Sequence, residues 1–155
     1  MTTTPSQTIG PFWHLLENPD WADLTRFGAE GDRIVLMGRL TDGDGAPVTD
    51  GCVELWQLDP AACDTFPAWG RCATDTDGRF RFVTLRPGPV PGLGNTLQAP
   101  HFAITILARG ILKALVTRAY FKGDPHNDAD PVLSLIEDPA RRQTLLARPS
   151  RRALP

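Results

Sequence analysis

Proline and glycine interrupt this chain from one end to the other, and they leave no room for a long helix. The 155 residues include 15 prolines and 14 glycines, which are spread throughout the sequence. Between them lie short segments in which apolar and polar residues alternate, roughly ten residues apart. Such spacing is typical of an antiparallel all-β sandwich. We therefore predict one β-sandwich domain over residues 1–155, with only short helices.

Five segments carry the alternation expected of strands that are buried on one face. They span residues 33–41, 52–59, 79–85, 101–109 and 114–121. Asp-Gly sequences at 42–48 and 74–78 predict hairpin turns. The second turn resembles the start of a calcium-binding EF-hand loop, but it lacks the downstream acidic ligand and the flanking helices. Short helices are predicted at 19–27 and after Asp138, where Pro139 would take the first helical position.

The strand predicted at 101–109 has a titratable residue at each end. One face carries the apolar residues expected in the core, and the other face begins with His101 and ends with Arg109. Eight steps of about 3.3 Å would separate these two residues by roughly 26 Å in an extended strand. Because no small site spans that distance, His101 and Arg109 need separate explanations.

Composition and charge indicate an ordinary soluble protein, with neither nucleic acid nor a membrane as its partner. Hydrophobic residues make up 41% of the chain, charged residues make up 22%, and the formal net charge is −2. No run approaches 18 consecutive apolar residues, and the first residues lack the pattern of a secretion signal. The spacing of Cys52, Cys63 and Cys72 fits neither a disulfide framework nor a zinc site. We expect reduced thiols and a cytoplasmic location.

Side-chain chemistry alone indicates no complete catalytic site. His14, His101 and His126 lie far apart, and there is no nucleophile elbow, phosphate-binding loop or dinucleotide fingerprint. A hydrogen-bonded or exposed His101 is therefore favoured over a metal ligand. Arg109 ends an apolar strand, where its guanidinium is either solvated or available to bind a carboxylate.

Several segments, taken in order, resemble the intradiol ring-cleavage dioxygenases. They are PSQTIGPF at 5–12 and the stretches 45–59, 70–91, 99–110 and 117–125. Within that family the chain is most similar to the alpha-type subunits of its two-subunit members. The similarity lies in the N-terminal arm, the Ala-Pro-His sequence at 99–101, the Leu-Ala-Arg-Gly sequence at 107–110, and the segment 130–147.

The resemblance implies a β-sandwich and a reaction in which ferric iron and O2 cleave a catechol between its two hydroxyls. In such enzymes two tyrosines and two histidines of the beta subunit hold the iron. Here Val90 and Ala103 stand at one tyrosine and one histidine position, and residues 60–70 contain no tyrosine. The sole tyrosine, Tyr120, matches a structural position. We therefore expect no catalytic residue, no metal ligand and no cofactor in this chain, with Fe(III) bound by a homologous beta subunit.

The resemblance also implies a positive role for this chain, as a wall of the beta subunit's active site. By motif match the substrate-binding residues are Thr8, Gly10 and Pro11 in an extended N-terminal arm (1–13), together with Arg109. A Gly-Pro segment offers a rigid backbone that a substrate can approach closely. An arginine would attract the carboxylate of an aromatic catechol acid.

One departure from the family concerns the C-terminal part of the sequence. Family members continue after the final helix with a further strand, whereas residues 148–155 read RPSRRALP, which predicts a basic, mobile tail. We expect the last family strand to be lacking and a sheet edge to be unpaired. Two other readings stay open: a catalytically silent binding or scaffold sandwich, which includes a truncated family remnant, and a self-sufficient enzyme that uses another metal.

Overall fold

The structure is a computed structural model in which residues 8–150 are described. Its strands are β1 (Arg33–Arg39), β2 (Cys52–Trp56), β3 (Trp69–Ala73), β4 (Arg79–Leu85), β5 (Val90–Pro91), β6 (Leu97–Gln98), β7 (His101–Leu107), β8 (Leu115–Phe121) and β9 (Leu146–Ala147). Four 3-10 helices cover Trp13–Leu16, Pro19–Ala22, Pro125–Ala129 and Leu133–Leu135, and one α-helix, α1, covers Pro139–Gln143. The predicted predominance of short strands over helices is confirmed.

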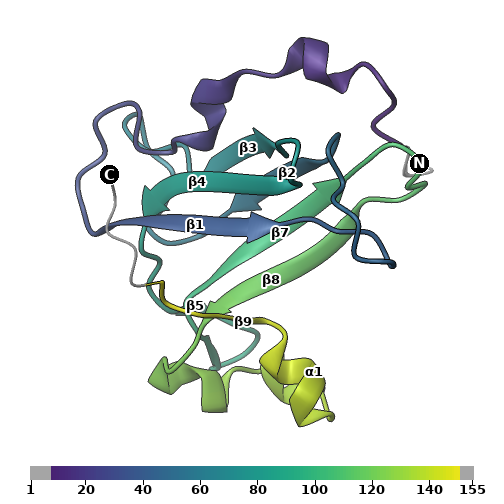
Figure 1. Cartoon of the computed structure of the whole chain (residues 1–155). Helices are drawn as coiled ribbons and strands as arrows, with labels where there is room; N and C mark the ends of the chain where they lie inside the picture. Colours follow the sequence, from purple (N-terminus) through teal and green to yellow (C-terminus); the bar gives the residue numbers. More distant parts are fainter. Residues whose placement is uncertain (1–7, 151–155) are drawn as a thin grey trace, which may run out of the picture.

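Two sheets face each other and enclose the main core (Figure 1). One sheet has the strand order β3-β2-β7-β8-β9, and the other is the pair β1-β4. A small hairpin joins β5 to β6. All of these pairs are antiparallel, as predicted, except β8 with β9, which is parallel. The core side chains come from both sheets and include Val53, Leu55, Phe82, Phe102 and Ile104.

The alternation read from the sequence matches the burial of β7. Phe102 and Ile104 are buried, and Ala108, just after the strand, is only 3% exposed. The strand ends at Leu107, two residues earlier than predicted, so Arg109 lies in the turn that follows. This places His101 and Arg109 at opposite ends of one central strand.

The Asp-rich segments are tight turns, but the hairpin prediction is wrong: β1 and β2 lie in different sheets, as do β3 and β4, so neither turn joins two strands that pair with each other. Asp75 accepts backbone N–H groups from Asp77 at 2.9 Å and from Arg79 at 2.8 Å. Asp42 does the same for Asp44 and Ala46. These carboxylates therefore hold the turns themselves, which is the ordinary role of aspartate there.

The helix predicted over 19–27 is wrong in its second half. A 3-10 helix covers only Pro19–Ala22, with the Asn18 side chain accepting the N–H of Asp20. The chain then crosses to β4, where the Leu24 N–H donates to the Val83 carbonyl at 2.9 Å. Leu24 is fully buried in the core, so tertiary packing overrides the local helical tendency.

Residues 19–24 also close one side of the sandwich. They lie against β3 and β4, and the absence of a side chain at Gly70 makes the close approach possible. A Cβ at Gly70 would lie 2.5 Å from Leu24 Cδ1 and 2.6 Å from the Trp21 carbonyl oxygen. On the opposite side, β1 pairs with β4 alone among the described strands.

A second, smaller core lies below the sheets and is drawn in the lower part of Figure 1. Ala99, Tyr120 and Leu133 are buried there, with Leu145 and Leu146 packed against them. Helix α1 begins after Asp138, whose carboxylate accepts the Ala140 N–H at 2.8 Å, and Pro139 takes the first helical position as predicted. This lobe supports the His101 end of β7.

Candidate functional site at the arm and the end of β7

The N-terminal arm meets the end of β7, although the two are about a hundred residues apart in sequence. The Thr8 hydroxyl donates to the Ala108 carbonyl at 3.4 Å. Farther along the arm, the Trp13 indole N–H donates to the Asp50 carbonyl at 3.0 Å. Trp13 was predicted to lie in an extended arm, but it is buried and begins a 3-10 helix. A buried indole whose N–H is hydrogen-bonded anchors the arm more firmly than an exposed indole would.

Asp50 joins the arm to Arg109. Its carboxylate oxygen Oδ2 lies 3.1 Å from Arg109 Nε, while its backbone oxygen holds Trp13. The Arg109 side chain is 69% exposed. The pair with Asp50 is made through Nε, and the exposure of the side chain leaves the guanidinium accessible from solvent. Arg109 is thus oriented at one end and available for an anion at the other.

The backbone of the arm turns sharply at Gly10, which has a φ of +78°. A Cβ placed there would meet no heavy atom within 4 Å, so the demand for glycine comes from the conformation and not from crowding. Pro11 follows and is exposed. The four residues expected to bind substrate, Thr8, Gly10, Pro11 and Arg109, therefore come from two segments joined by the Thr8 and Asp50 contacts. Of the predicted arm, residues 1–7 lie outside the described part.

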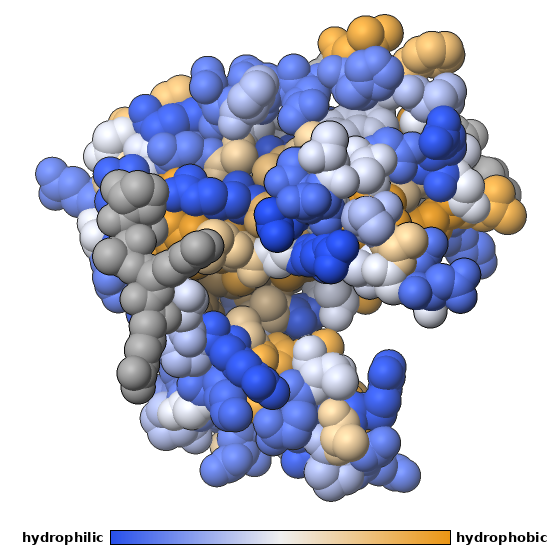
Figure 2. All heavy atoms as spheres, viewed as in Figure 1, coloured by the Kyte–Doolittle hydropathy of each residue, from blue (hydrophilic) through white to orange (hydrophobic). Residues whose placement is uncertain are grey.

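Exposed apolar side chains flank these contacts. The arm presents Phe12 (69% exposed) and Leu15 (72%), and the β7–β8 connection and the start of β8 present Leu112, Leu115 and Val116. Figure 2 shows hydrophobic residues on the surface over the arm helix at the top of the view. Clusters of this kind mark surfaces that contact other molecules.

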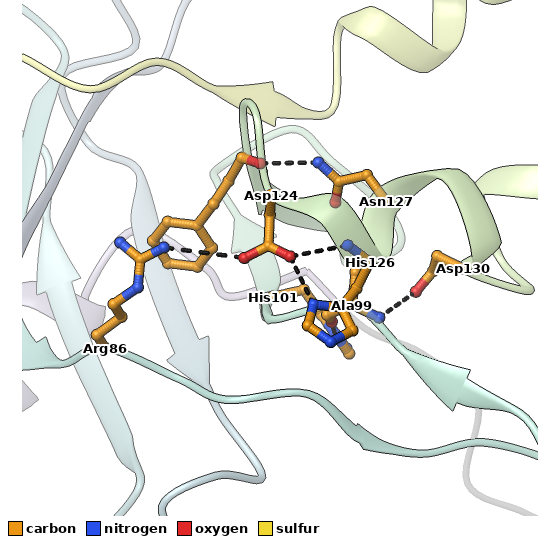
Figure 3. Close-up of polar contacts among 8 residues, drawn as sticks. Arg86, Ala99, His101, Asp124, His126, Asn127 and Asp130 are labelled. Carbon is orange, nitrogen blue, oxygen red and sulfur yellow. Dashed lines mark hydrogen bonds and ion pairs between the residues drawn. The ribbon is translucent and has the colours of Figure 1, made fainter.

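The other end of β7 is filled by protein contacts (Figure 3). His101 Nδ1 donates to the Ala99 carbonyl at 2.8 Å, which fixes the proton on that nitrogen because a carbonyl only accepts. The imidazole lies against Tyr120, with ring centroids 5.2 Å apart. Burial lowers the pKa of His101, because removal from water disfavours the charged imidazolium. The hydrogen-bonded reading of His101 is confirmed.

Tyr120 is fully buried, and polar groups surround its hydroxyl. The hydroxyl receives a hydrogen bond from Arg118 at 3.1 Å and donates to Asp130 at 3.3 Å. Burial is the main cause of the raised pKa of Tyr120. Asp130 is itself buried and accepts the N–H groups of Ala99 and Leu133 at 2.7 and 2.8 Å. This phenol is a structural group that ties β8 to the lower lobe.

Asp124 organises the start of that lobe in a similar way (Figure 3). It accepts both the backbone N–H and the Nδ1–H of His126, at 3.0 and 2.8 Å. Arg86 lies 3.8 Å from the same carboxylate and sits over the Phe121 ring. His126 therefore serves the 3-10 helix that begins at Pro125.

Comparison with known proteins decides the family. Residues 17–154 match a family described as "Dioxygenase". The alpha chain of protocatechuate 3,4-dioxygenase from Pseudomonas putida is 39% identical, and the alignment covers 94% of this chain and 83% of that relative. The corresponding alpha chain from Burkholderia cepacia is 37% identical, with 96% and 86% covered. The chain belongs to the intradiol dioxygenase family. Its members are oxidoreductases, and the match to alpha chains is consistent with an intradiol dioxygenase subunit.

Other relatives agree with this assignment. The beta chain of protocatechuate 3,4-dioxygenase from B. cepacia is 31% identical over 88% of this chain and 63% of that relative. Among solved structures, the dioxygenase domain of a carbohydrate-binding fusion protein from Streptomyces sp. SirexAA-E is 29% identical, with a TM-score of 0.64 and coverage of 94% and 86%. Chlorocatechol 1,2-dioxygenase from P. putida, at 18% identity and a TM-score of 0.63 over 93% and 65%, shares the fold.

The positions that match the family's iron ligands do not fit a metal in this dioxygenase chain. Val90 is buried and apolar, and Ala103, opposite Arg118 on β8, has no donor atom. His101 already uses Nδ1 on Ala99, and the Tyr120 hydroxyl is held by Arg118 and Asp130. Within residues 8–150 no group of three or more His, Cys, Asp or Glu side chains could hold a metal ion. One remaining ligand of four cannot bind iron in the family's manner.

Two residues of the site were not identified from the sequence. Asp50 precedes Gly51 in a turn-like stretch, where aspartate usually serves the turn, and nothing in the sequence pairs it with Arg109. Trp13 was assigned to an extended arm. An indole next to a short apolar stretch could have signalled an anchor.

Among the described residues, no helix is both long and apolar enough to cross a membrane.

Proposed function

We propose that this chain is the iron-free alpha-type subunit of a protocatechuate 3,4-dioxygenase. Its partner is a homologous beta subunit that holds Fe(III), and the complex cleaves 3,4-dihydroxybenzoate with O2 to 3-carboxy-cis,cis-muconate. The identity to alpha chains (39% and 37%) is higher than that to a beta chain (31%), which supports the alpha assignment. The lack of donor atoms at Val90 and Ala103 supports placing the metal in the partner.

The observation that carries the proposal is the contact between the arm and the strand end. Thr8 binds the Ala108 carbonyl, and Asp50 holds Arg109 by Nε, so the arm and the guanidinium form one edge. Exposed apolar residues beside it, such as Phe12 and Val116, suit a surface that a second subunit covers. This edge would border the beta subunit's active site.

Each residue of the edge has a distinct role in the proposal. The terminal nitrogens of the exposed Arg109 bind the substrate carboxylate in a two-pronged contact, which only a guanidinium supplies. Gly10 and Pro11 provide a wall of fixed backbone, and Thr8 holds that wall to β7 through Ala108. The chemistry of the ring and of O2 belongs to the partner's iron.

Co-expression tests the division of labour. Purified alone, the chain is expected to be colourless, low in iron and inactive. Together with its beta subunit it should form a stable complex with the colour of ferric iron bound to tyrosinate. Iron content, the visible spectrum and O2 uptake give three separate readings. A coloured, active preparation of the chain alone would overturn the proposal and favour a self-sufficient enzyme.

The Arg109→Ala substitution in the complex tests the role of the edge. Loss of a charge-assisted contact of about 1.5–3 kcal/mol should raise KM for 3,4-dihydroxybenzoate roughly tenfold to a hundredfold. Catechol, which lacks the carboxylate, should be unaffected by the substitution. Arg141→Ala, on exposed helix α1, is the matched control. The same KM in the Arg109 variant as in the wild type would favour the scaffold reading instead.

A further inference from the structure

Asp50 connects three segments of the chain, and it uses a different atom for each neighbour. Its backbone oxygen accepts the indole N–H of Trp13 in the arm at 3.0 Å. Its carboxylate oxygen Oδ2 lies 3.1 Å from Nε of Arg109, just after β7. Asp50 itself lies in the turn before β2, and in Figure 1 the arm, this turn and the end of β7 meet on the right of the molecule. One residue therefore relates the position of the arm to that of Arg109.

The turn that carries Asp50 is fixed to the end of β3 by Thr74. The Gly51 N–H donates to the Thr74 hydroxyl at 2.9 Å, and that hydroxyl donates to the Val48 carbonyl at 2.7 Å. The Thr74 N–H also donates to the Gly51 carbonyl at 2.9 Å. Thr74 is only 6% exposed, so these bonds are largely shielded from water. The backbone on both sides of Asp50 is thus held in place.

Arg109 has no such backbone support for its side chain. It lies in the turn after β7, and its side chain is 69% exposed. A long arginine side chain in solvent samples many rotamers, and it must be ordered when an anion binds. The Asp50 carboxylate draws Nε toward one position before any anion arrives. Part of the ordering is therefore already done in the folded chain.

The side on which Asp50 lies also determines how a second carboxylate can approach. Two carboxylates at the same edge of a guanidinium repel each other. Because Asp50 is on the Nε side of Arg109, an incoming carboxylate is favoured at the opposite end of the guanidinium. The Asp50 charge also weakens the attraction for any anion, but its side chain is 42% exposed and solvent screens that effect. The ordering of Arg109 is the larger of the two effects.

We propose that Asp50 is a positioning residue for the carboxylate of the substrate. It holds the Arg109 guanidinium, at a fixed place relative to the arm, in the orientation that binds an aromatic catechol acid. This inference rests on the proposed function, in which the arm and Arg109 border the partner's active site. Asp50 does not touch the substrate. It acts through Arg109, so it affects only substrates that carry a carboxylate.

Asp50→Ala in the complex with the beta subunit tests the effect on substrate binding. The substitution removes the carboxylate and keeps the backbone oxygen that holds Trp13. We expect KM for 3,4-dihydroxybenzoate to rise about threefold to tenfold, the cost of ordering one long side chain, with kcat changed less than about twofold. KM for catechol should change less than about twofold. Asp44→Ala, at an exposed position in the preceding turn, is the matched control and should behave as the wild type.

Two further substitutions at Asp50 separate positioning from folding. Asp50→Asn keeps an oxygen of the same reach and should give a KM between those of the wild type and Asp50→Ala. Asp50→Ser is too short to reach Nε and should repeat the effect of alanine, which keeps the test valid if the alanine variant does not fold. Melting temperatures should stay within about 3 °C of the wild type, because exposed ion pairs contribute little to stability.

A double variant tests whether Asp50 acts through Arg109. If it does, Asp50→Ala combined with Arg109→Ala should have the same KM for 3,4-dihydroxybenzoate as Arg109→Ala alone. Effects that multiply in the double variant would show an independent action of Asp50 and would overturn the inference. A KM that falls in Asp50→Ala would also overturn it, because the Asp50 charge would then only compete with the substrate.

NMR relaxation of the Arg109 Nε–H bond gives a reading that does not depend on activity. In the full chain labelled with ¹⁵N, its order parameter should fall below about 0.6, the range of flexible groups, in Asp50→Ala but not in Asp44→Ala. An equal order parameter in the wild type and Asp50→Ala would show that Asp50 does not hold the guanidinium.

Arg109→Ala distinguishes a failure of this inference from a failure of the proposed function. An unchanged KM in Arg109→Ala would overturn the proposed function, and this inference with it. A raised KM in Arg109→Ala together with a wild-type KM in Asp50→Ala would overturn this inference alone and leave the proposed function in place.

Discussion

Asp130 is the polar residue on which the lower lobe depends. Its buried carboxylate accepts the N–H groups of Ala99, Val132 and Leu133, in addition to the Tyr120 hydroxyl. Asp130→Ala leaves these donors without an acceptor, and we expect it to cost about 3–5 kcal/mol of unfolding free energy. Urea denaturation measures this loss.

Asp128→Ala is the matched control, two residues away in an exposed position. It should change the unfolding free energy by no more than about 0.5 kcal/mol. If the two variants were equally stable, the hydrogen bonds of Asp130 would contribute little, and the lower lobe would be held by its apolar contacts alone.

His101 should make stability depend on pH. Burial lowers its pKa below the ordinary 6.5, so the unfolded chain takes up a proton at a higher pH than the folded chain does. The stability that His101 contributes is fully present above pH 6.5. It is lost as the pH falls from 6.5 through the pKa of His101 in the folded state. His101→Gln should lose less stability than the wild type over about pH 5 to 6.5, as measured by urea denaturation. His14→Gln, at an exposed position, should leave the wild-type slope unchanged.

At the scale of residues, the alternation and the family motifs identified the residues at the two ends of β7. They did not identify the aspartates that contact those ends. His101 and Arg109 were identified because they stand at the two ends of an apolar segment, and Arg109 also because it matches a family motif. Asp50 and Asp130 were not, because an aspartate in a turn and an aspartate that holds buried N–H groups look alike in a sequence. The difference between them is burial, which depends on contacts between residues far apart in the chain.

At the scale of elements, Gly70 sets how closely the segment 19–24 crosses β3. Gly70→Ala should cost about 1–3 kcal/mol, because the new methyl group would meet the Trp21 carbonyl oxygen at 2.6 Å and backbone cannot easily move. Thermal unfolding measures the loss. Gly43→Ala, where a Cβ meets nothing within 4 Å, is the control and should be near neutral. Equal melting temperatures would show that the crossing can relax.

The strands were more predictable than the segments that cross between sheets. Alternation is a local signal, so β1, β4, β7 and β8 were found within about two residues of their ends. The segment 19–27 was misassigned because its course depends on a bond from Leu24 to Val83 in β4, about sixty residues away. Helix α1 was found because Asp138 and Pro139 mark its start locally.

At the scale of the whole molecule, the three thiols should report different degrees of opening. Burial raises the pKa of Cys52, at the centre of the larger sheet, to about 12, and burial also raises that of Cys72. Cys63 is exposed, and its hydrogen bond from Thr65 lowers its pKa. With a thiol reagent near pH 8, Cys63 should react first and Cys52 only when the sheet opens. Mass spectrometry of the labelled peptides assigns the order.

The result that would contradict this expectation is rapid labelling of Cys52 in the folded chain. Otherwise the rate at Cys52 gives the free energy of global opening. Cys63→Ser removes the fast reaction at the surface and leaves those of Cys72 and Cys52, which the labelled peptides separate.

The segment that closes one side of the sandwich has a consequence for assembly. Sheets with two free edges can pass strand pairing from molecule to molecule and grow without limit. Here the far edge of β4 is occupied by residues 23–24, so the β1–β4 sheet can gain a strand on one side only. Any complex formed through that sheet is therefore finite, with one added strand for each chain. In such complexes this molecule terminates a row of strands and cannot continue it.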